Sequence, residues 1–423
     1  MNGLMWFRHD LRLSDNPAIT ALSRRCNKAI FLYVIDPNWF RPVRFQCSHM
    51  GKFRQEFLYQ TLRELDTQLR INRQRLVVKV GNPLEIIPNL CKKHRIDLIS
   101  MTSHPGVYER HQVANLQRQT DCEVQTAESF TMFLENQIPF QQDDFPATFT
   151  KFRKYIEKNH ILPCFPICAP DDYPQRITES SDSFDDQEFI FDLRPYRGGE
   201  DSANFQLNQY FWKSHRVKNY KETRNGFDGW NFSSRLSAWL ANGSISVRTV
   251  AAELENYEYR HGKDESTQAL YFELLWREYF QWMMNIHGSK MFQFAGIKQK
   301  RPLTSFYSQQ YKSWEEGTTD YPIVNACMRQ LKHTGWLSNR GRQIAASCLV
   351  NELGVDWRFG AAYFEQQLID FDVASNFGNW QYLAGVGADP RGQRHFNLEK
   401  QAAYYDPDGM FVKKWSAESS TIR

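Results

Sequence analysis

The chain has 423 residues, of which 41% are hydrophobic and 24% charged, and its formal net charge is +4. This length allows two or three domains with separate cores, and the composition excludes a disordered, collagen-like or solenoid protein. No run reaches the roughly twenty apolar residues of a membrane span, and the first apolar run is too short for a signal peptide.

Residues 1–130 alternate short apolar runs with longer amphipathic patterns. The longer patterns, at 51–70 and 82–96, have the spacing of helices, whereas the short runs have the length of buried strands. The strand-like runs lie at 4–8, 29–35, 75–81, 98–102 and 123–128. Such an alternation predicts a parallel, doubly wound α/β sheet. No G-x-G-x-x-G follows the first run, so the nucleotide fingerprint of a dehydrogenase is absent.

The remainder of the chain changes character twice. Residues 131–199 are rich in Pro, Asp and Ser, which predicts a connector that wraps the surface. From 200 to 423 apolar residues recur with a helical period and Gly or Asn residues end the patterns, at 205–224, 233–243, 246–262, 269–288 and 323–336. We therefore predict an α/β domain (1–130), a connector (131–199) and an all-helical domain (200–423) with a moderately basic surface.

The eight cysteines are scattered, and only Cys164 and Cys168 lie close together. Without a second cluster they do not complete a zinc site, so we expect no bound metal. Reduced thiols are typical of the cytoplasm, where we expect the protein to act as a monomer.

Three serines stand at the start of a predicted helix of the C-terminal half. Ser233, Ser234 and Ser237 offer hydroxyls and backbone N–H groups, a geometry that suits phosphate groups. Ordinary helix capping uses the same residue types. The sequence leaves both interpretations open.

A carboxylate, an indole and a guanidinium share one face of the predicted helix at 269–288. Glu273, Trp276 and Arg277 are spaced three and four residues apart, which places them side by side. Apolar residues mark another face of this helix as core. The polar face therefore either lines a cavity or carries a surface ion pair.

Two further segments combine charge with apolar surroundings. Asn339, Arg340 and Arg342 come just before an apolar helical pattern. An isolated buried charge costs several kcal/mol, so such arginines need acidic partners. We predict that Arg342 pairs with Asp370. That carboxylate opens a glycine-broken run with Asp372, Asn376, Trp380 and Tyr382.

Taken together, these segments resemble the photolyase/cryptochrome family. Matching motifs occur in the family's order at 6–18, 232–246, 274–280, 322–343 and 368–382. Details at 145–157, 220–227, 338–343 and 381–409 are similar to the DASH cryptochrome branch. The resemblance implies an α/β domain followed by a helical domain that binds FAD.

The resemblance also assigns the flavin site. By motif match, FAD would be held by Tyr220, Ser233, Ser234, Leu236, Ser237, Arg277, Asn339, Arg342, Asp370, Asp372 and Asn376, with Asn376 at flavin N5. Trp380 and Trp357 match the first two tryptophans of the family's photoreduction chain. The place of the third falls at or near Thr304. Phe306, Tyr307 and Trp314 are the candidates to replace it.

For substrate, the resemblance implies a pyrimidine dimer flipped out of DNA into the flavin cavity. Glu273 would hydrogen-bond the dimer and Trp276 would stack on it. Tyr382 and Gln343 stand where ordinary photolyases carry tryptophan and methionine, which favours a DASH-type deoxyribodipyrimidine photo-lyase that prefers single-stranded DNA. The expected contacts to DNA and lesion are made by Arg224, Glu273, Trp276, Arg340, Gln343 and Tyr382.

An antenna pigment, 5,10-methenyltetrahydrofolate, is expected in the α/β domain. Glu109 is the candidate partner of its pterin ring; a solvated surface glutamate is the alternative. Two other functions compete with repair. A blue-light receptor would use the same flavin pocket, and an electron-transfer flavoprotein or adenine-nucleotide-binding protein would leave Glu273 and Trp276 unexplained. Repair of (6-4) photoproducts is disfavoured because no histidine stands in 272–280 or 338–343.

Overall fold

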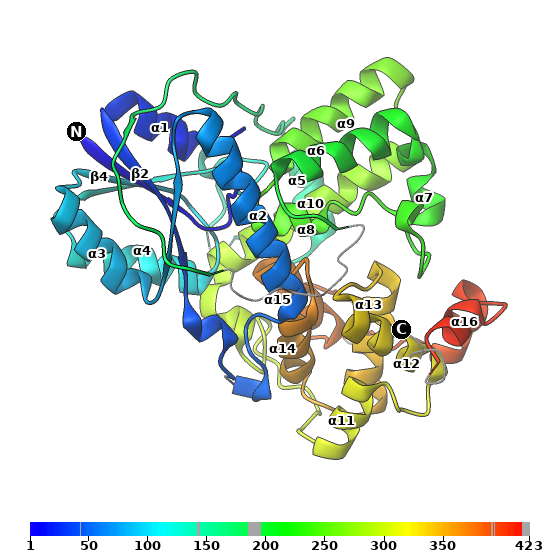
Figure 1. The fold of residues 1–423 in the computed structure, drawn as a ribbon. Helices are drawn as coiled ribbons and strands as arrows, with labels where there is room; N and C mark the ends of the chain where they lie inside the picture. The colour runs from blue at the N-terminus through cyan, green and yellow to red at the C-terminus, as the bar shows by residue number, and fades with distance from the viewer. Residues whose placement is uncertain (43, 142–143, 185–195, 391, 393, 417–423) are drawn as a thin grey trace.

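The computed structural model describes residues 1–42, 44–141, 144–184, 196–390, 392 and 394–416. A sheet with flanking helices forms one half of the molecule, and a helical domain forms the other (Figure 1). This confirms the predicted fold class. No helix in the described part of the chain is both long enough and apolar enough to cross a bilayer.

The α/β half is a parallel sheet with strand order β3-β2-β1-β4-β5. Its strands are β1 (Asn2–Phe7), β2 (Lys28–Ile35), β3 (Leu76–Val80), β4 (Leu98–Thr102) and β5 (Glu123–Ala127). Helices α1 (Pro17–Arg25), α2 (Lys52–Ile71), α3 (Pro83–His94) and α4 (Val107–Gln119) connect them. The inner strands are buried almost throughout, because helices cover both faces of a doubly wound sheet. The order reverses between β1 and β4, so the sheet has a crevice at the carboxyl ends of these two strands.

The segment expected as a surface connector is partly built into both halves. Helix α5 (Phe149–Lys158) buries Phe149, Phe152 and Ile156 against the helical domain. The short strand β6 (Gln175–Arg176) pairs with β2. Phe149, Phe152 and Ile156 are three and four residues apart, so they form one apolar face of α5.

The helical domain is centred on α10 (Glu265–His287), which Asp264 caps through the N–H groups of Ser266 and Thr267. Around it lie α6 (Glu200–Asn208), α7 (Tyr220–Thr223), α8 (Ser237–Asn242), α9 (Val247–His261), α11 (Ser308–Glu316), α12 (Pro322–Thr334), α13 (Asn339–Ser347), α14 (Trp357–Gln367), α15 (Val373–Leu383), α16 (Leu398–Tyr405) and α17 (Met410–Lys414). Short 3-10 or π turns occur at Pro37–Phe40, Arg44–Gln46, Glu135–Gln137, Gln209–Lys213, Arg216–Asn219 (η5), Trp230–Phe232, Gly288–Phe292 and Cys348–Glu352.

One predicted helix is broken. The pattern at 205–224 is helical throughout, yet the structure ends α6 at Asn208 and continues through a π turn, η5 and α7. The break falls at His215, whose φ of 49° is left-handed and cannot continue an α-helix.

Buried carboxylates join the two halves. Glu278 of α10 accepts hydrogen bonds from Met132 N (2.8 Å) and Phe133 N (3.2 Å). Glu200 of α6 accepts from Leu13 N at 2.7 Å. Glu64 of α2 accepts from the backbone N–H groups of Glu200 and Asp201 at the start of α6. Side chains of each half therefore satisfy backbone groups that the other half leaves unpaired.

The carboxyl of Glu64 makes the stability of this interface depend on pH. Burial raises the pKa of Glu64 to about 7, although its hydrogen bonds with backbone N–H groups act in the opposite direction. A carboxyl with a raised pKa binds protons more readily folded than unfolded, so its contribution to stability falls as pH rises from about 4.5 to about 7. In urea unfolding, Glu64→Gln should gain stability relative to the parent chain between pH 5 and pH 8. A difference that does not change with pH would contradict this.

Candidate functional site

A cavity of about 410 Å³ opens within the helical domain. Side chains of α7, α8, α10, α13 and α15 form its wall. Of the residues predicted for flavin and lesion, it is lined by Tyr220, Arg224, Ser233, Ser234, Leu236, Ser237, Glu273, Trp276, Arg277, Asn339, Arg342, Gln343, Asp370, Asp372, Asn376, Trp380 and Tyr382. Segments far apart in the sequence thus converge on one space.

The predicted pair of Arg342 and Asp370 is present. The Nη2 atom of Arg342 lies 2.9 Å and 2.8 Å from the two carboxylate oxygens of Asp370. The Asp370 side chain is only 2% exposed. Arg342 also donates through Nε to Leu337 O, so both charges are fixed in place.

Asp372 is a second, half-buried carboxylate on the cavity wall. It caps α15 by accepting from Ser375 N at 2.7 Å, and Gln281 Nε2 donates to both of its oxygens. Burial tends to raise the pKa of Asp372, but the charge of Arg277 and these hydrogen bonds outweigh it and lower the pKa. The carboxylate is therefore ionised at neutral pH.

The serines before α8 are not helix caps. Helix α8 begins at Ser237, its N-cap residue is Leu236, and no side chain caps it. The hydroxyls of Ser233, Ser234 and Ser237 line the cavity and form no hydrogen bond with another described residue. Of the two interpretations left open, the structure excludes capping and leaves the hydroxyls available to a ligand.

Glu273 forms an ion pair, but not with its neighbour on the helix. Its Oε1 atom lies 2.5 Å from Nη1 of Arg224. Arg277 turns instead to Phe130, donating to its carbonyl oxygen at 3.0 Å and lying over its ring. Because Glu273 and Arg224 are both partly exposed at the cavity wall, an entering ligand can compete for them.

An aromatic corner lies next to Glu273. The rings of Trp276 and Tyr382 are 5.9 Å apart and nearly perpendicular, at 80°. Phe149 of α5 stacks on Trp276 at 3.9 Å, and the guanidinium of Arg394 lies 4.5 Å above the ring of Tyr382. Sequence reasoning missed both supporting residues, since neither lies near its partner in the sequence.

Three expected residues lie outside the cavity. Arg340 sits over the ring of Tyr405 at 4.6 Å and makes weak hydrogen bonds to Gln401 and Asn225. Trp357 is fully buried behind the wall and donates to Phe294 O. Glu109 belongs to a different cavity.

Trp380 contacts further aromatic rings through which an electron could reach it. Trp314, fully buried, lies 6.2 Å from Trp380 and 6.3 Å from Tyr311. Phe306 and Tyr307 are exposed, but their rings do not contact Trp380 in the described structure. Of the three candidates for the missing position, only Trp314 therefore adjoins the cavity tryptophan.

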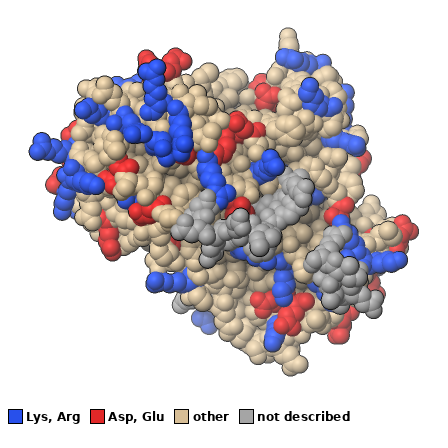
Figure 2. Space-filling model, in the orientation of Figure 1, with Lys and Arg blue, Asp and Glu red and all other residues tan. Residues whose placement is uncertain are grey.

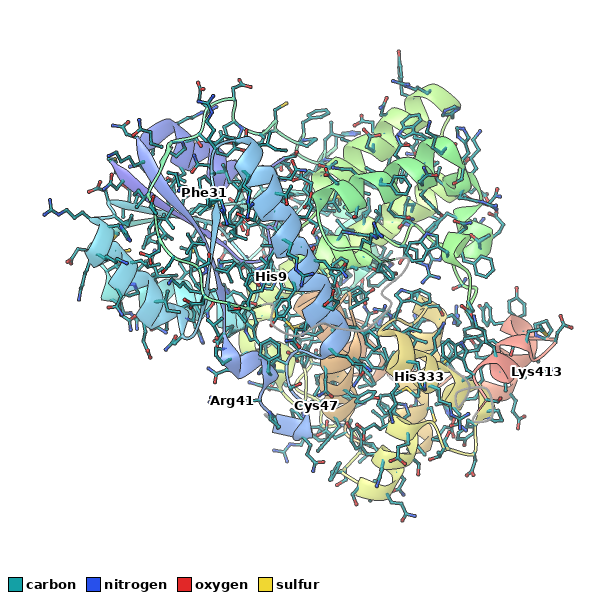
Figure 3. All side chains as sticks on the ribbon, viewed as in Figure 1. His9, Phe31, Arg41, Cys47, His333 and Lys413 are labelled. Carbon is teal, nitrogen blue, oxygen red and sulfur yellow. The ribbon has the colours of Figure 1, made fainter. Side chains whose placement is uncertain are left out.

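A second cavity, of about 480 Å³, lies between the two halves at the crevice of the sheet. His9 follows β1 and His104 follows β4, at the carboxyl ends of the strands where the order reverses. Figure 3 shows His9 between the sheet and the helical domain. Glu109, in the first turn of α4, completes a cluster with these two histidines.

Within this cluster Glu109 is within hydrogen-bonding distance of His9 and lies near His104. Its Oε1 lies 3.1 Å from His9 Nε2, and its Oε2 lies 3.7 Å from His104 Nδ1. Burial tends to raise the pKa of Glu109, but His104 and His9 outweigh it and hold the pKa well below the usual range. Although the three residues have the composition of a metal site, His104 Nδ1 already accepts a hydrogen bond from Gly106 N. Glu109 is thus an ionised, half-buried acceptor rather than a solvated glutamate.

The two cavities share a wall. Ala241, Phe371 and Asp372 line both of them. The guanidinium of Arg54 lies 4.6 Å above the ring of Phe371 on the side of the second cavity.

Comparisons with known proteins agree with this architecture. Residues 3–171 match the family model for DNA photolyase, and residues 270–423 match that for the FAD binding domain of DNA photolyase. The solved Synechocystis cryptochrome superposes on 100% of this chain and 89% of its own with a TM-score of 0.94 and 36% identity. A class III photolyase from Agrobacterium tumefaciens does so over 98% of this chain and 86% of its own, with a TM-score of 0.84 and 25% identity.

The chain therefore belongs to the photolyase/cryptochrome family. Among its named relatives, cryptochrome DASH of Idiomarina loihiensis is 44% identical over 99% of this chain and 93% of the relative. Cryptochrome DASH of Vibrio parahaemolyticus is also 44% identical, over 99% of this chain and 94% of the relative.

The helical cavity fits FAD chemically. Free serine hydroxyls suit a diphosphate, and the amide nitrogen of Asn376 donates to Ala361 O, which leaves its oxygen as the acceptor for a ligand. The paired charges of Arg342 and Asp370 also line the cavity, and charges near a flavin ring tune its redox potential.

The Arg342–Asp370 pair should dominate the stability of this cavity. Arg342→Ala leaves Asp370 buried without its counter-charge, which should cost about 3–5 kcal/mol of unfolding free energy and release the flavin. Denaturant unfolding and the flavin-to-protein absorbance ratio measure the two effects. The double variant Arg342→Ala/Asp370→Asn should recover part of the stability. A stable, fully flavinated Arg342→Ala protein would refute the assigned role.

Proposed function

We propose that this protein repairs cyclobutane pyrimidine dimers under blue light, preferentially in single-stranded DNA, as a deoxyribodipyrimidine photo-lyase. The observation that carries the proposal is the aromatic corner of Trp276 and Tyr382, which opens beside Glu273 into the FAD cavity. A flavoprotein that only transfers electrons does not need aromatic side chains arranged to bind a second ligand beside the flavin. The names of the relatives describe cryptochromes, so light sensing is the competing function.

The corner suits a flipped dimer. Two pyrimidine rings joined by a cyclobutane are inclined to one another, and two perpendicular aromatic walls offer a face or edge to each. Phe149 stacks on one face of Trp276 and Arg394 lies over one face of Tyr382, and these contacts would hold both rings in place for the lesion.

Glu273 would hold the dimer by its polar edge. Pyrimidine N3–H groups are donors, and the Glu273 carboxylate is an acceptor once Arg224 releases it. Arg224 would then be free for a phosphate of the lesion strand, a role for which Arg340 is the second candidate. Exchanging one ion pair for a hydrogen bond and a phosphate contact keeps both charges partnered.

The other wall of the cavity would bind the cofactor. Ser233, Ser234 and Ser237 would hold the diphosphate, and Asn376 Oδ1 would accept from flavin N5–H. Reduced FAD, when bound and excited by light, would supply the electron that opens the cyclobutane ring and would take the electron back once the ring has split. The helices around the cavity exclude water from this exchange.

The preference for a single strand rests on Tyr382 and Gln343. Tyrosine offers less stacking area than tryptophan, and a glutamine amide less apolar contact than a thioether. Flipping a base out of a duplex costs a few kcal/mol, which the weaker contacts would not fully recover.

We also propose that the second cavity holds a folate antenna, 5,10-methenyltetrahydrofolate. The ionised Glu109 is placed to accept from the amino and ring N–H groups of a pterin. Since all eight cysteines are free thiols, a cytoplasmic location is part of the proposal, with the chain acting as a monomer.

Photoreduction of the oxidised cofactor tests the tryptophan route. Trp380→Phe should abolish it, and Trp314→Phe should slow it, because Trp314 is the neighbour of Trp380 on the branch towards Tyr311. Tyr259→Phe, a change at an exposed ring of α9 that is not a candidate for this route, is the control and should have no effect. Flash absorption measures the rates. Normal photoreduction in Trp380→Phe would show that electrons arrive by another path.

The substrate is tested with one thymine dimer in three settings. Repair by chemically reduced enzyme under blue light should be about a hundredfold better in a single strand than in a paired duplex, since a deficit of ~3 kcal/mol corresponds to that factor. A dimer in a bubble should be repaired like the single strand. Glu273→Gln should slow repair without loss of FAD. Equal repair of duplex and single strand would refute the preference, and no repair in any setting would favour the receptor.

A further inference from the structure

A group of exposed cations and imidazole rings lies beside the helical cavity and takes no part in the function proposed above. We call it the flank patch; it comprises Lys213, His215, Arg216, Lys218, Arg260 and His261. These residues come from the π turn after α6, from η5 and from the end of α9. Figure 2 shows Lys and Arg side chains over the lobe that α7 and α9 form.

The rings of the flank patch are fixed rather than loose. His215 Nδ1 lies 2.9 Å from the hydroxyl of the buried Tyr257. The ring of His261 is 5.1 Å from that of His215 and 4.6 Å from that of Tyr257. Arg260 lies over the indole of Trp212 at 5.2 Å. An exposed surface of ordered rings and a guanidinium loses little entropy when it binds a flat partner.

The cations of the patch lack acidic partners among the described residues. None of Lys213, Arg216, Lys218 and Arg260 forms an ion pair with a carboxylate in the described part of the chain. Neighbouring lysines do: Lys221 pairs with Glu265, and Lys263 with Glu258. Slight desolvation and the neighbouring His215, Lys218 and Arg260 lower the pKa of His261, as expected where positive charge gathers.

The patch is close to the lesion side of the cavity. Element η5 ends at Asn219 and α7 begins at Tyr220, which lines the cavity together with Arg224. At 1.5–2.0 Å per residue, about 12–16 Å of helical chain separates Arg216 from Arg224. A strand held at Arg224 therefore reaches the patch within a few nucleotides.

We propose that the flank patch binds the single-stranded DNA that continues from the lesion, with its cations on phosphates and its histidine rings against unpaired bases. This rests on the proposed function, which places the lesion in the cavity. Aromatic rings among cations are the usual surface for single strands. In a duplex the bases face each other and are closed to the rings, so the patch adds to the preference for single strands.

The test compares two variants with the same reduction in positive charge. One carries Lys213→Gln, Arg216→Gln, Lys218→Gln and Arg260→Gln. The control carries Arg24→Gln, Lys28→Gln, Lys92→Gln and Arg118→Gln, all exposed positions of the α/β half. Fluorescence anisotropy measures the binding of strands of about twenty and about five nucleotides, each with and without a central dimer, over a range of salt concentrations.

For the long strand, the patch variant should bind at least tenfold more weakly at low salt. Its slope of log K against log salt should become shallower by about 0.7 for each phosphate that the patch no longer neutralises. Binding and repair of the short dimer strand should be unchanged, as should all properties of the control. In a second variant, His215→Ala/His261→Ala, long-strand affinity should fall without a change in salt slope.

Several results would overturn the proposal. One is an equal drop of long-strand affinity in the control, which would make the effect one of net charge. Another is unchanged long-strand binding in the patch variant. If the parent chain repairs no dimer, the proposed function fails alone, and undamaged strands of the two lengths still decide whether the patch binds DNA.

Discussion

The helical domain depends on keeping ionised side chains inside an apolar core, and the pair of Arg342 and Asp370 meets this constraint at the wall of the cavity. Asp370 is nearly inaccessible to water, so its charge is tolerated only next to a guanidinium held in register. Arg342 also binds Leu337 O, and Ile369 N donates to Gly335 O. The pair therefore fastens the loop before α13 to the loop before α15. Both walls of the flavin cavity are positioned from these two loops.

The function of the cavity depends on the groups that this arrangement leaves available to ligands. Two polar residues of the cavity wall are held by protein partners: Asp372 by Gln281 and Ser375, and Asn376 by Ala361. The serine hydroxyls, the inner aromatic faces and the exchangeable Glu273–Arg224 pair face the cavity. A preformed site of this kind requires little rearrangement when its ligands bind, so little binding energy is lost to ordering the site.

Periodicity in the sequence predicts the fold class, and the need for charge balance predicts the Arg342–Asp370 pair; the other residues of the cavity follow from the resemblance to the photolyase/cryptochrome family. The strand-like runs and the pairing of Arg342 with Asp370 are predictable in this way. Contacts that arise only from tertiary packing cannot be predicted in this way. Phe149 lies in a segment that resembles a surface connector, yet it stacks on Trp276. The partner of Glu273 is Arg224, far away in the sequence, instead of the helical neighbour Arg277. His215 adopts a left-handed conformation that ends the helical run, although no Gly or Pro in the sequence indicates a break there.

The wall between the two cavities has a thermodynamic consequence. Phe371 and Asp372 present one side to each space, and a small shift of either residue is felt in both. If the occupant of one cavity displaces this partition, the free energy of coupling is the same in either direction. Whatever factor the proposed antenna pigment would impose on affinity for the flavin, the flavin would impose the same factor on affinity for the pigment. The fraction of protein that carries one chromophore would then depend on whether the other chromophore is bound.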